Sequence, residues 1–328
     1  MKRIPGKVFQ YLLAFVCIIS LNFFLVHLMP GDPLIHLLGE EGYFHLHSQK
    51  PQVLEDLKAK YELDGPICKQ YLVYFTNTLK GDFGWSYHYG RPVFQVILFR
   101  LKWTLVLLLP SILIAAILGA WLGSLAGWKR GVKSDRLFTP VFLFVYSTPV
   151  YCLGLLFVLL FAYYMHLFPL GGMAEETSSG LAGFLGTLRH MALPMAVLAL
   201  HGTAYNYLIM RNSVREVVRE EYILAAISRG LKERRVLFAH AFKNALPPLI
   251  TVVALDFGFI IGGALLVEIV FSWQGMGMVI YDAVISRDYP LLSGCFSILA
   301  VCVIFVNALA DVIYAVVDPR IRDGVPDV

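Results

Sequence analysis

The chain has 328 residues, of which 58% are hydrophobic and 15% are charged, and its mean hydropathy is +0.68. Soluble domains are about 45–50% apolar and about 25% charged, so this composition excludes a soluble globular protein and a disordered one. The formal net charge of +4 is too small to indicate nucleic-acid binding, and the five cysteines form no CxxC pair that would predict a metal site.

Six apolar stretches are long enough to cross a bilayer as helices, which takes about 20 residues each. They lie at 8–29, 103–127, 138–165, 190–210, 247–270 and 291–317. Backbone polar groups in lipid must be paired within the segment, so we predict an all-α polytopic membrane protein with six transmembrane helices. The first stretch is too long for a cleaved signal peptide and lacks an A-x-A site, so we expect it to remain as an anchor.

Lys and Arg residues are distributed unevenly between the predicted loops. With six spans, one face carries 17 of them and the other carries 10, eight of which lie in one long segment, 30–102. The positive-inside rule therefore predicts that both termini are cytoplasmic. The predicted parts are a tail and first helix at 1–29, an extracytoplasmic helical segment at 30–102, a five-helix core at 103–317 with a cytoplasmic loop at 211–246, and a cytoplasmic tail at 318–328.

The segment 30–102 contains two amphipathic runs, Val53–Tyr61 and Ile67–Leu79, which predict short helices packed on the outer face. His45 and His47 form an H-x-H pair in the same segment. Two histidines without nearby partner ligands are more often surface residues, so a metal site is the minor alternative.

Two pairs of prolines lie in the predicted spans, one pair inside the third span and the other at the start of the fifth. Pro140 and Pro149 predict a kink in the third span, where the hydroxyl side chains before Pro149 are able to pair the freed backbone groups. Pro247 and Pro248 are expected to open the fifth span, because the first turn of a helix tolerates proline.

Polar residues inside the spans are costly in lipid and therefore indicate function by default. The fourth and fifth spans hold Tyr205, Asn206, Asp256 and Glu268. We expect these four to line a translocation path, and the alternative is that they form hydrogen bonds between helices and fix the packing. For Asn307 and Asp311 of the sixth span, the packing interpretation is preferred.

The cytoplasmic loop carries the most informative pattern. A helix is predicted from Val214 to Arg229, and Gly230 suits the left-handed conformation that follows a helix C-terminus. Small, charged and apolar residues surround the end of this helix, namely Ala225, Ala226, Arg229 and Leu231. From this pattern alone, an amphipathic helix that lies on the membrane surface is an equally good interpretation.

Several stretches resemble the permease subunits of ABC importers for dipeptides, oligopeptides and nickel, and among these the first-permease type. The match to the EAA loop of that family falls on Tyr222, Ala226, Gly230, Leu231, His240, Asn244, Ala245 and Pro248. Pro30–Pro33, Gly81–Ser86, Val267–Gly277, Asp288–Pro290 and Asp318–Arg322 agree as well, in the same order. The sequence departs at Ala239, where the family has arginine, and at Gln274, which replaces a proline.

The resemblance implies that the chain is half of a membrane channel that imports peptides or nickel-type chelates by alternating access. The 211–246 loop would dock on a cytoplasmic ATPase through Tyr222, Ala225, Ala226, Arg229, Gly230, Leu231, His240 and Asn244. The implied partners are a second homologous permease, two ATPase subunits, an extracytoplasmic substrate-binding protein and the bilayer of a bacterial or archaeal inner membrane. The sequence has no G-x-x-x-x-G-K-[S/T] motif, so we expect ATP and Mg²⁺ on the ATPase subunits, and neither a cofactor nor catalysis on this chain.

Three other functions stay open from the sequence. An ATP-independent secondary transporter or channel predicts inverted repeats, which are not evident. An intramembrane enzyme needs buried catalytic groups such as an HExxH motif, which the sequence lacks. A structural scaffold would leave the pattern of the loop without a purpose.

Overall fold

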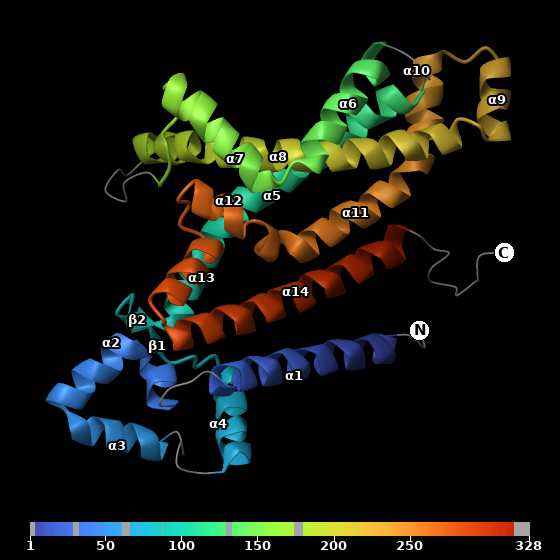
Figure 1. Ribbon diagram of the computed structural model, residues 1–328. Coiled ribbons are helices and arrows are strands. Elements are labelled where there is room, and N and C mark those ends of the chain that lie inside the picture. Colours follow the sequence, from blue (N-terminus) through green and yellow to red (C-terminus); the bar gives the residue numbers. More distant parts are fainter. Residues whose placement is uncertain are drawn as a thin grey trace. The chain divides into compact units, whose positions relative to one another are not determined.

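The computed structural model describes residues 4–28, 33–60, 66–86, 88–128, 133–173 and 180–317. The chain divides into two units, residues 1–104 with 274–305 and residues 105–273 with 306–328. Helices α5 (Val93–Trp128) and α14 (Tyr289–Val317) contribute to both units (Figure 1). Within the described residues, the regular elements are helices and one short β-hairpin, in agreement with the predicted all-α class.

Several of the described helices are long and apolar enough to cross a membrane. Four qualify alone: α5, α8 (Leu181–Val217), the stretch Glu233–Asp256 and the stretch Tyr289–Leu309. A fifth candidate is the bent pair Asp135–Ser147 and Val150–Tyr164, and shorter apolar stretches lie at Phe9–Phe24 and Met276–Ile285. The prediction of a helical protein with several spans is confirmed, and the count of six stays a prediction.

The first unit contains α1 (Ile4–Leu28), α2 (Pro33–Gln49), α3 (Pro51–Lys60) and α4 (Ile67–Leu79). Helix α4 has the bounds predicted from its amphipathic run, and α3 begins two residues before the run predicted for it. Asn22 of α1 donates hydrogen bonds to the Tyr74 hydroxyl of α4 at 3.0 Å and to the Ser293 carbonyl oxygen of α14 at 2.9 Å. One amide side chain thereby links α1 to both α4 and α14.

A hairpin of β1 (Trp85–Ser86) and β2 (Arg91–Pro92) precedes α5, with its strands antiparallel. The buried carboxylate of Asp288 accepts hydrogen bonds from Ser86 Oγ at 2.6 Å and from the Leu291 backbone N–H at 3.2 Å. Asp288 therefore fixes the hairpin and also caps the N-terminus of α14.

Tyr89, in the turn of this hairpin, donates its hydroxyl proton to Asp282 of α13 (Met276–Ile285) at 2.6 Å. Burial and this hydrogen bond raise the pKa of Tyr89 well above its ordinary value. The guanidinium of Arg100 lies 5.5 Å from the centre of the Tyr89 ring. The hairpin is thus attached to α13 as well as to α14.

The turn that leads into α13 is held by the first part of α5. Arg100 donates a hydrogen bond to the side-chain oxygen of Gln274, and the Met276 backbone N–H donates to Thr104 Oγ1 at 2.7 Å. Gln274 stands where the resembled family has proline, and its side chain supplies a hydrogen bond that proline would not offer.

The second unit is organised by a close contact between α5 and α8. Three glycines recur every four residues on α5, at Gly119, Gly123 and Gly127. A Cβ atom on Gly119 would lie 2.4 Å from Asn206 Cβ, and one on Gly123 would lie 2.7 Å from the Tyr207 carbonyl oxygen. The two helix backbones approach this closely because the three positions carry no side chain.

The predicted third span is a broken helix rather than a kinked one. Helix α6 (Lys133–Ser147) is followed by α7 (Val150–Phe157) and the π-helix η1 (Val158–Tyr164), and the two parts meet at 103°. The break falls at Thr148–Pro149, because a proline disfavours the helical conformation at the residue before it. Thr148 Oγ1 donates to the Phe144 carbonyl oxygen at 2.8 Å, whereas Pro140 lies inside α6 without a break.

Helix α8 continues to Val217, and α9 covers only Glu221–Ser228. The predicted helix from Val214 to Arg229 is therefore wrong at its start. Val214 belongs to α8, where it is completely buried in an apolar cluster with Met210. A turn at 218–220 separates the two helices (Figure 1).

The predicted fifth span begins earlier and ends earlier than expected. Helix α10 (Glu233–Val236), the π-helix η2 (Leu237–Ala241) and α11 (Phe242–Gly263) follow one another directly, and α12 (Leu265–Val270) is separate. Pro247 and Pro248 therefore lie inside α11 and do not open it. Four buried residues at helical spacing extend the helix upstream of the prolines: Val236, Leu237, Ala241 and Ala245.

Candidate functional site

Helix α9 packs through one face and exposes the other. Ile223 and Ala226 are buried in a cluster with residues of α8, α10, η2 and α11. Leu224 is 55% exposed and Ile227 is 44% exposed. Residues three apart lie on the same side of a helix, so Leu224 and Ile227 form an apolar face directed away from the protein.

A hydrogen bond links α9 to α11 across the loop. Asn244 Nδ2 donates to the Tyr222 hydroxyl at 2.8 Å and to the His240 carbonyl oxygen, one turn earlier, at 3.1 Å. The structure thus brings together Tyr222, His240 and Asn244, which the sequence predicts to lie in one loop. This bond fixes the first turn of α9 to the helix that follows.

The end of α9 has the glycine termination that the sequence predicts. Gly230 has a φ of +78°, in the left-handed region that favours glycine. Its N–H donates to the Ile227 carbonyl oxygen at 2.9 Å, and the Leu231 N–H donates to the Ala226 carbonyl oxygen at 3.4 Å. A Cβ on Gly230 would have no heavy atom within 4 Å, and Ala225 and Arg229 are exposed beside it. The exposed face of α9 therefore ends in open, uncrowded surface.

Tyr205 and Asn206 are neighbours on α8 but contact different helices. The half-buried ring of Tyr205 stacks on Tyr146 of α6, with centroids 5.3 Å apart. Asn206 is completely buried against Gly119 of α5, and its side-chain amide has no hydrogen-bond partner among the described residues. Only Tyr205 of this pair belongs to a partly exposed surface.

The other two predicted path residues also differ in exposure. Asp256 on α11 is half-buried, and Glu268 on α12 is completely buried. Helix α12 packs against α7 and α8, so the Glu268 side chain does not face open space in this structure. Asn307 is half-buried on α14, and the Asp311 side chain lies outside the described residues.

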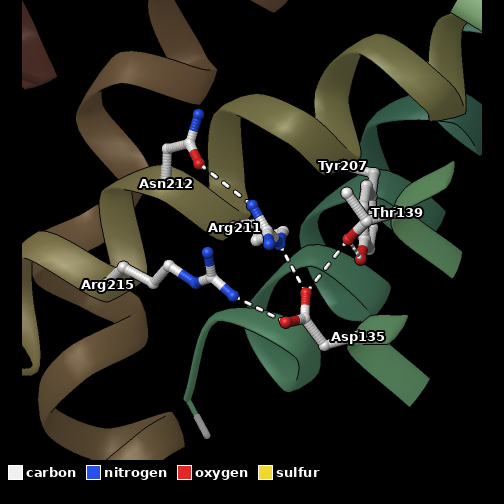
Figure 2. Close-up of polar contacts among 6 residues, drawn as sticks. All are labelled: Asp135, Thr139, Tyr207, Arg211, Asn212 and Arg215. Carbon is white, nitrogen blue, oxygen red and sulfur yellow. Dashed lines mark hydrogen bonds and ion pairs between the residues drawn. The ribbon is translucent and has the colours of Figure 1, made fainter. Parts of the chain in front are cut away.

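An ionic cluster that the sequence pattern does not predict joins α6 to α8 around the buried Asp135. Asp135 of α6 accepts a hydrogen bond from Arg211 Nε at one carboxylate oxygen and from Arg215 Nη2 at the other, each at 2.6 Å (Figure 2). Thr139 Oγ1 donates to Asp135 at 3.0 Å and lies 2.9 Å from the Tyr207 hydroxyl. The available signal was the spacing of Arg211 and Arg215, which places both on one face of a helix.

The comparisons with known proteins agree with one another. The sequence model of a family described as the binding-protein-dependent transport system inner membrane component matches residues 119–323. The dipeptide transport system permease protein DppB of Escherichia coli (strain K12) is 34% identical over 327 residues, which cover 94% of this chain and 95% of the relative. The di/tripeptide permease DppB of Pseudomonas aeruginosa (strain UCBPP-PA14) is 34% identical, covering 92% of this chain and 93% of the relative. The oligopeptide permease AppB of Bacillus subtilis (strain 168) has the same identity and coverage.

Proposed function

The chain belongs to the family of inner membrane components of binding-protein-dependent transport systems, and we propose that it forms half of the translocation path of an ATP-driven importer of short peptides. The three relatives named above are permeases for dipeptides, di/tripeptides and oligopeptides, which favours peptides over nickel chelates as the substrate class. A second permease, two ATPase subunits and an extracytoplasmic binding protein complete the proposed complex. Both termini then lie in the cytoplasm, and 30–102 lies outside.

The division of α9 into a packed face and an exposed face carries this proposal. Ile223 and Ala226 hold the helix on the protein, while Leu224 and Ile227 present apolar surface on the side proposed to be cytoplasmic. Small and apolar side chains allow a partner to approach closely, which suits docking on an ATPase subunit. The three-residue turn at 218–220 is short enough to pass a displacement of α9 on to α8.

Partial exposure supports a lining role for two of the predicted path residues. Tyr205 stacks with Tyr146 on the side of α8 that faces α6, and Asp256 is half-buried on α11. We include both in the proposed path. Asn206 and Glu268 would reach it only after a movement of the helices, because both are completely buried here.

The first test is purification of the tagged chain from its native membranes, followed by mass spectrometry of the proteins that co-purify. We expect a second multi-span permease and an ATPase with a Walker motif. Reconstituted with the binding protein, the complex should take up peptide only when ATP is present. Uptake by this chain alone without ATP would instead establish the secondary transporter.

Leu224→Asp and Ile227→Asp test the docking face directly. Each variant should weaken ATPase binding by roughly tenfold or more, because a carboxylate buried in an apolar contact costs more than about 1.4 kcal/mol. Ile67→Asp is the control, since Ile67 is 59% exposed on α4, which the proposal places on the opposite side of the membrane. Unchanged ATPase binding in both α9 variants would show that α9 is not the docking helix.

A further inference from the structure

The ionic cluster around Asp135 joins the beginning of α6 to the end of α8. Asp135 is in the first turn of α6, which begins at Lys133. Arg211 and Arg215 lie on the last two turns of α8, which ends at Val217, four residues before the start of α9. The cluster therefore connects the first half of the broken span to the end of α8 (Figure 2), close in sequence to the proposed ATPase-docking helix.

The contacts of Asp135 with the two arginines are charge-assisted hydrogen bonds. Asp135 is 7% exposed, and the Arg211 and Arg215 side chains are 14% and 23% exposed. Hydrogen bonds between ionised partners are roughly twice as strong as neutral ones. Because each arginine binds a different oxygen of the same carboxylate, one residue of α6 is tied to two successive turns of α8.

The neighbouring contacts decide which helices move together. A Cβ on Gly127 would lie 2.6 Å from the Arg211 carbonyl oxygen, so the end of α5 also packs tightly on this part of α8. At its other end, α6 is separated from α7 by the break at Thr148–Pro149 and the 103° bend. Helix α6 is thus bound to α8 at its start and is not continuous with α7 at its end.

We propose that Asp135 is a positioning residue that fixes α6 to the end of α8, so that a displacement of α9 moves α6 and α8 together. The proposal rests on the proposed importer function, because the ATPase subunits supply the displacement. Without the cluster, only the apolar packing of α6 on α8 would pass the displacement on, and α6 would follow the end of α8 less completely. ATP would then be hydrolysed without a matching reorientation of the path.

The charges of the cluster allow a variant that preserves folding. One carboxylate faces two guanidinium groups, so the cluster carries one excess positive charge. Asp135→Asn leaves two partly buried guanidinium groups without a counter-charge and endangers assembly. Arg215→Gln instead leaves the neutral pair of Asp135 and Arg211 and removes only the bond nearest to α9. Glu216→Gln is the matched control, because Glu216 is the adjacent residue and is exposed.

The experiment measures peptide uptake and ATP hydrolysis in the same proteoliposomes, with the complete complex and peptide-loaded binding protein. We expect the ratio of peptide taken up to ATP hydrolysed to fall about tenfold in Asp135→Asn and several-fold in Arg215→Gln, and to stay unchanged in Glu216→Gln. If Asp135→Asn does not assemble, the ratio measured for Arg215→Gln alone tests the positioning role of the cluster.

The outcomes separate this proposal from the function on which it rests. A wild-type complex without ATP-driven uptake would refute the proposed function itself. A wild-type complex that couples normally, with an unchanged ratio in Arg215→Gln, would overturn the positioning role of the cluster. A proportional loss of uptake and hydrolysis, with the ratio preserved, would also overturn it, because such a loss reflects only the amount of folded complex.

Discussion

Replacement of Gly119 by alanine should force α5 and α8 apart. The added Cβ would lie 2.4 Å from Asn206 Cβ, whereas two carbon atoms have their optimal separation at about 3.5–4.0 Å. Both atoms are attached directly to a helix backbone, so no side-chain rotation relieves the clash. The helices must separate locally by roughly 1 Å, and overpacking of this kind costs about 1–3 kcal/mol.

The assay is thermal unfolding of the purified chain in detergent, followed by intrinsic fluorescence. For a chain of this size, we expect Tm to fall by roughly 2–10 °C in Gly119→Ala. Ile117→Ala on the same helix is the control, because Ile117 is 67% exposed and its truncation should change Tm little. If Gly119→Ala unfolds at the wild-type temperature, the close contact between α5 and α8 is not present in the protein.

Three further predictions concern hydrogen bonds that link one element of the fold to another. Tyr222→Phe removes the acceptor of the Asn244 amide and should cost about 1 kcal/mol, seen as faster hydrogen exchange over 221–228; unchanged exchange would contradict the link. Burial and the hydrogen bond to Asp282 raise the folded-state pKa of Tyr89, so the neutral hydroxyl stabilises the fold below the ordinary pKa of about 10, and this stabilisation is lost as the pH rises through the raised value. Tyr89 should therefore stay protonated in a spectrophotometric titration to about pH 12, so wild type and Tyr89→Phe should show the same number of ionising tyrosines. One additional ionising tyrosine in wild type would show that the pKa of Tyr89 is not raised. Asp288→Ala removes the anchor of the β1–β2 hairpin and the cap of α14, so we expect a cost of about 2–3 kcal/mol and proteolysis in the hairpin, whereas an intact hairpin would argue against the anchor.

Local patterns predicted the parts of the fold that depend on local physics. The bounds of α4 follow from its amphipathic run, and the left-handed Gly230 follows from the absence of a side chain. At Thr148–Pro149 the sequence predicted a kink, and the structure has a bend of 103° between two separate helices. Hydropathy is continuous across 138–165 and does not report the direction of a helix axis. The start of the helix before Pro247 was missed, because burial against α8 and α9 outweighs the local preference for a helix start at proline.

In the candidate site, too, the sequence predicted local features but not the contacts that depend on tertiary packing. The sequence grouped Tyr205 with Asn206, yet neighbouring residues of a helix point about 100° apart, and the partners on each side are set by the tertiary fold. Asp135 and Arg215 are 80 positions apart, and only the packing of α6 on α8 makes them a pair. Contacts of this kind depend on which helices are neighbours, which a single sequence does not reveal.

The glycine face of α5 also bears on how the chain is built into the membrane. The most apolar window of α5 has a mean hydropathy of 2.6, whereas that of α8 has only 1.4. During synthesis α5 emerges first and partitions into lipid readily, while α8 brings a buried amide at Asn206 and two arginines near its end. We therefore expect the glycine face formed by Gly119, Gly123 and Gly127 to be in the bilayer before α8 and to receive it there. In this expectation, an earlier segment of the chain assists the insertion of a later one.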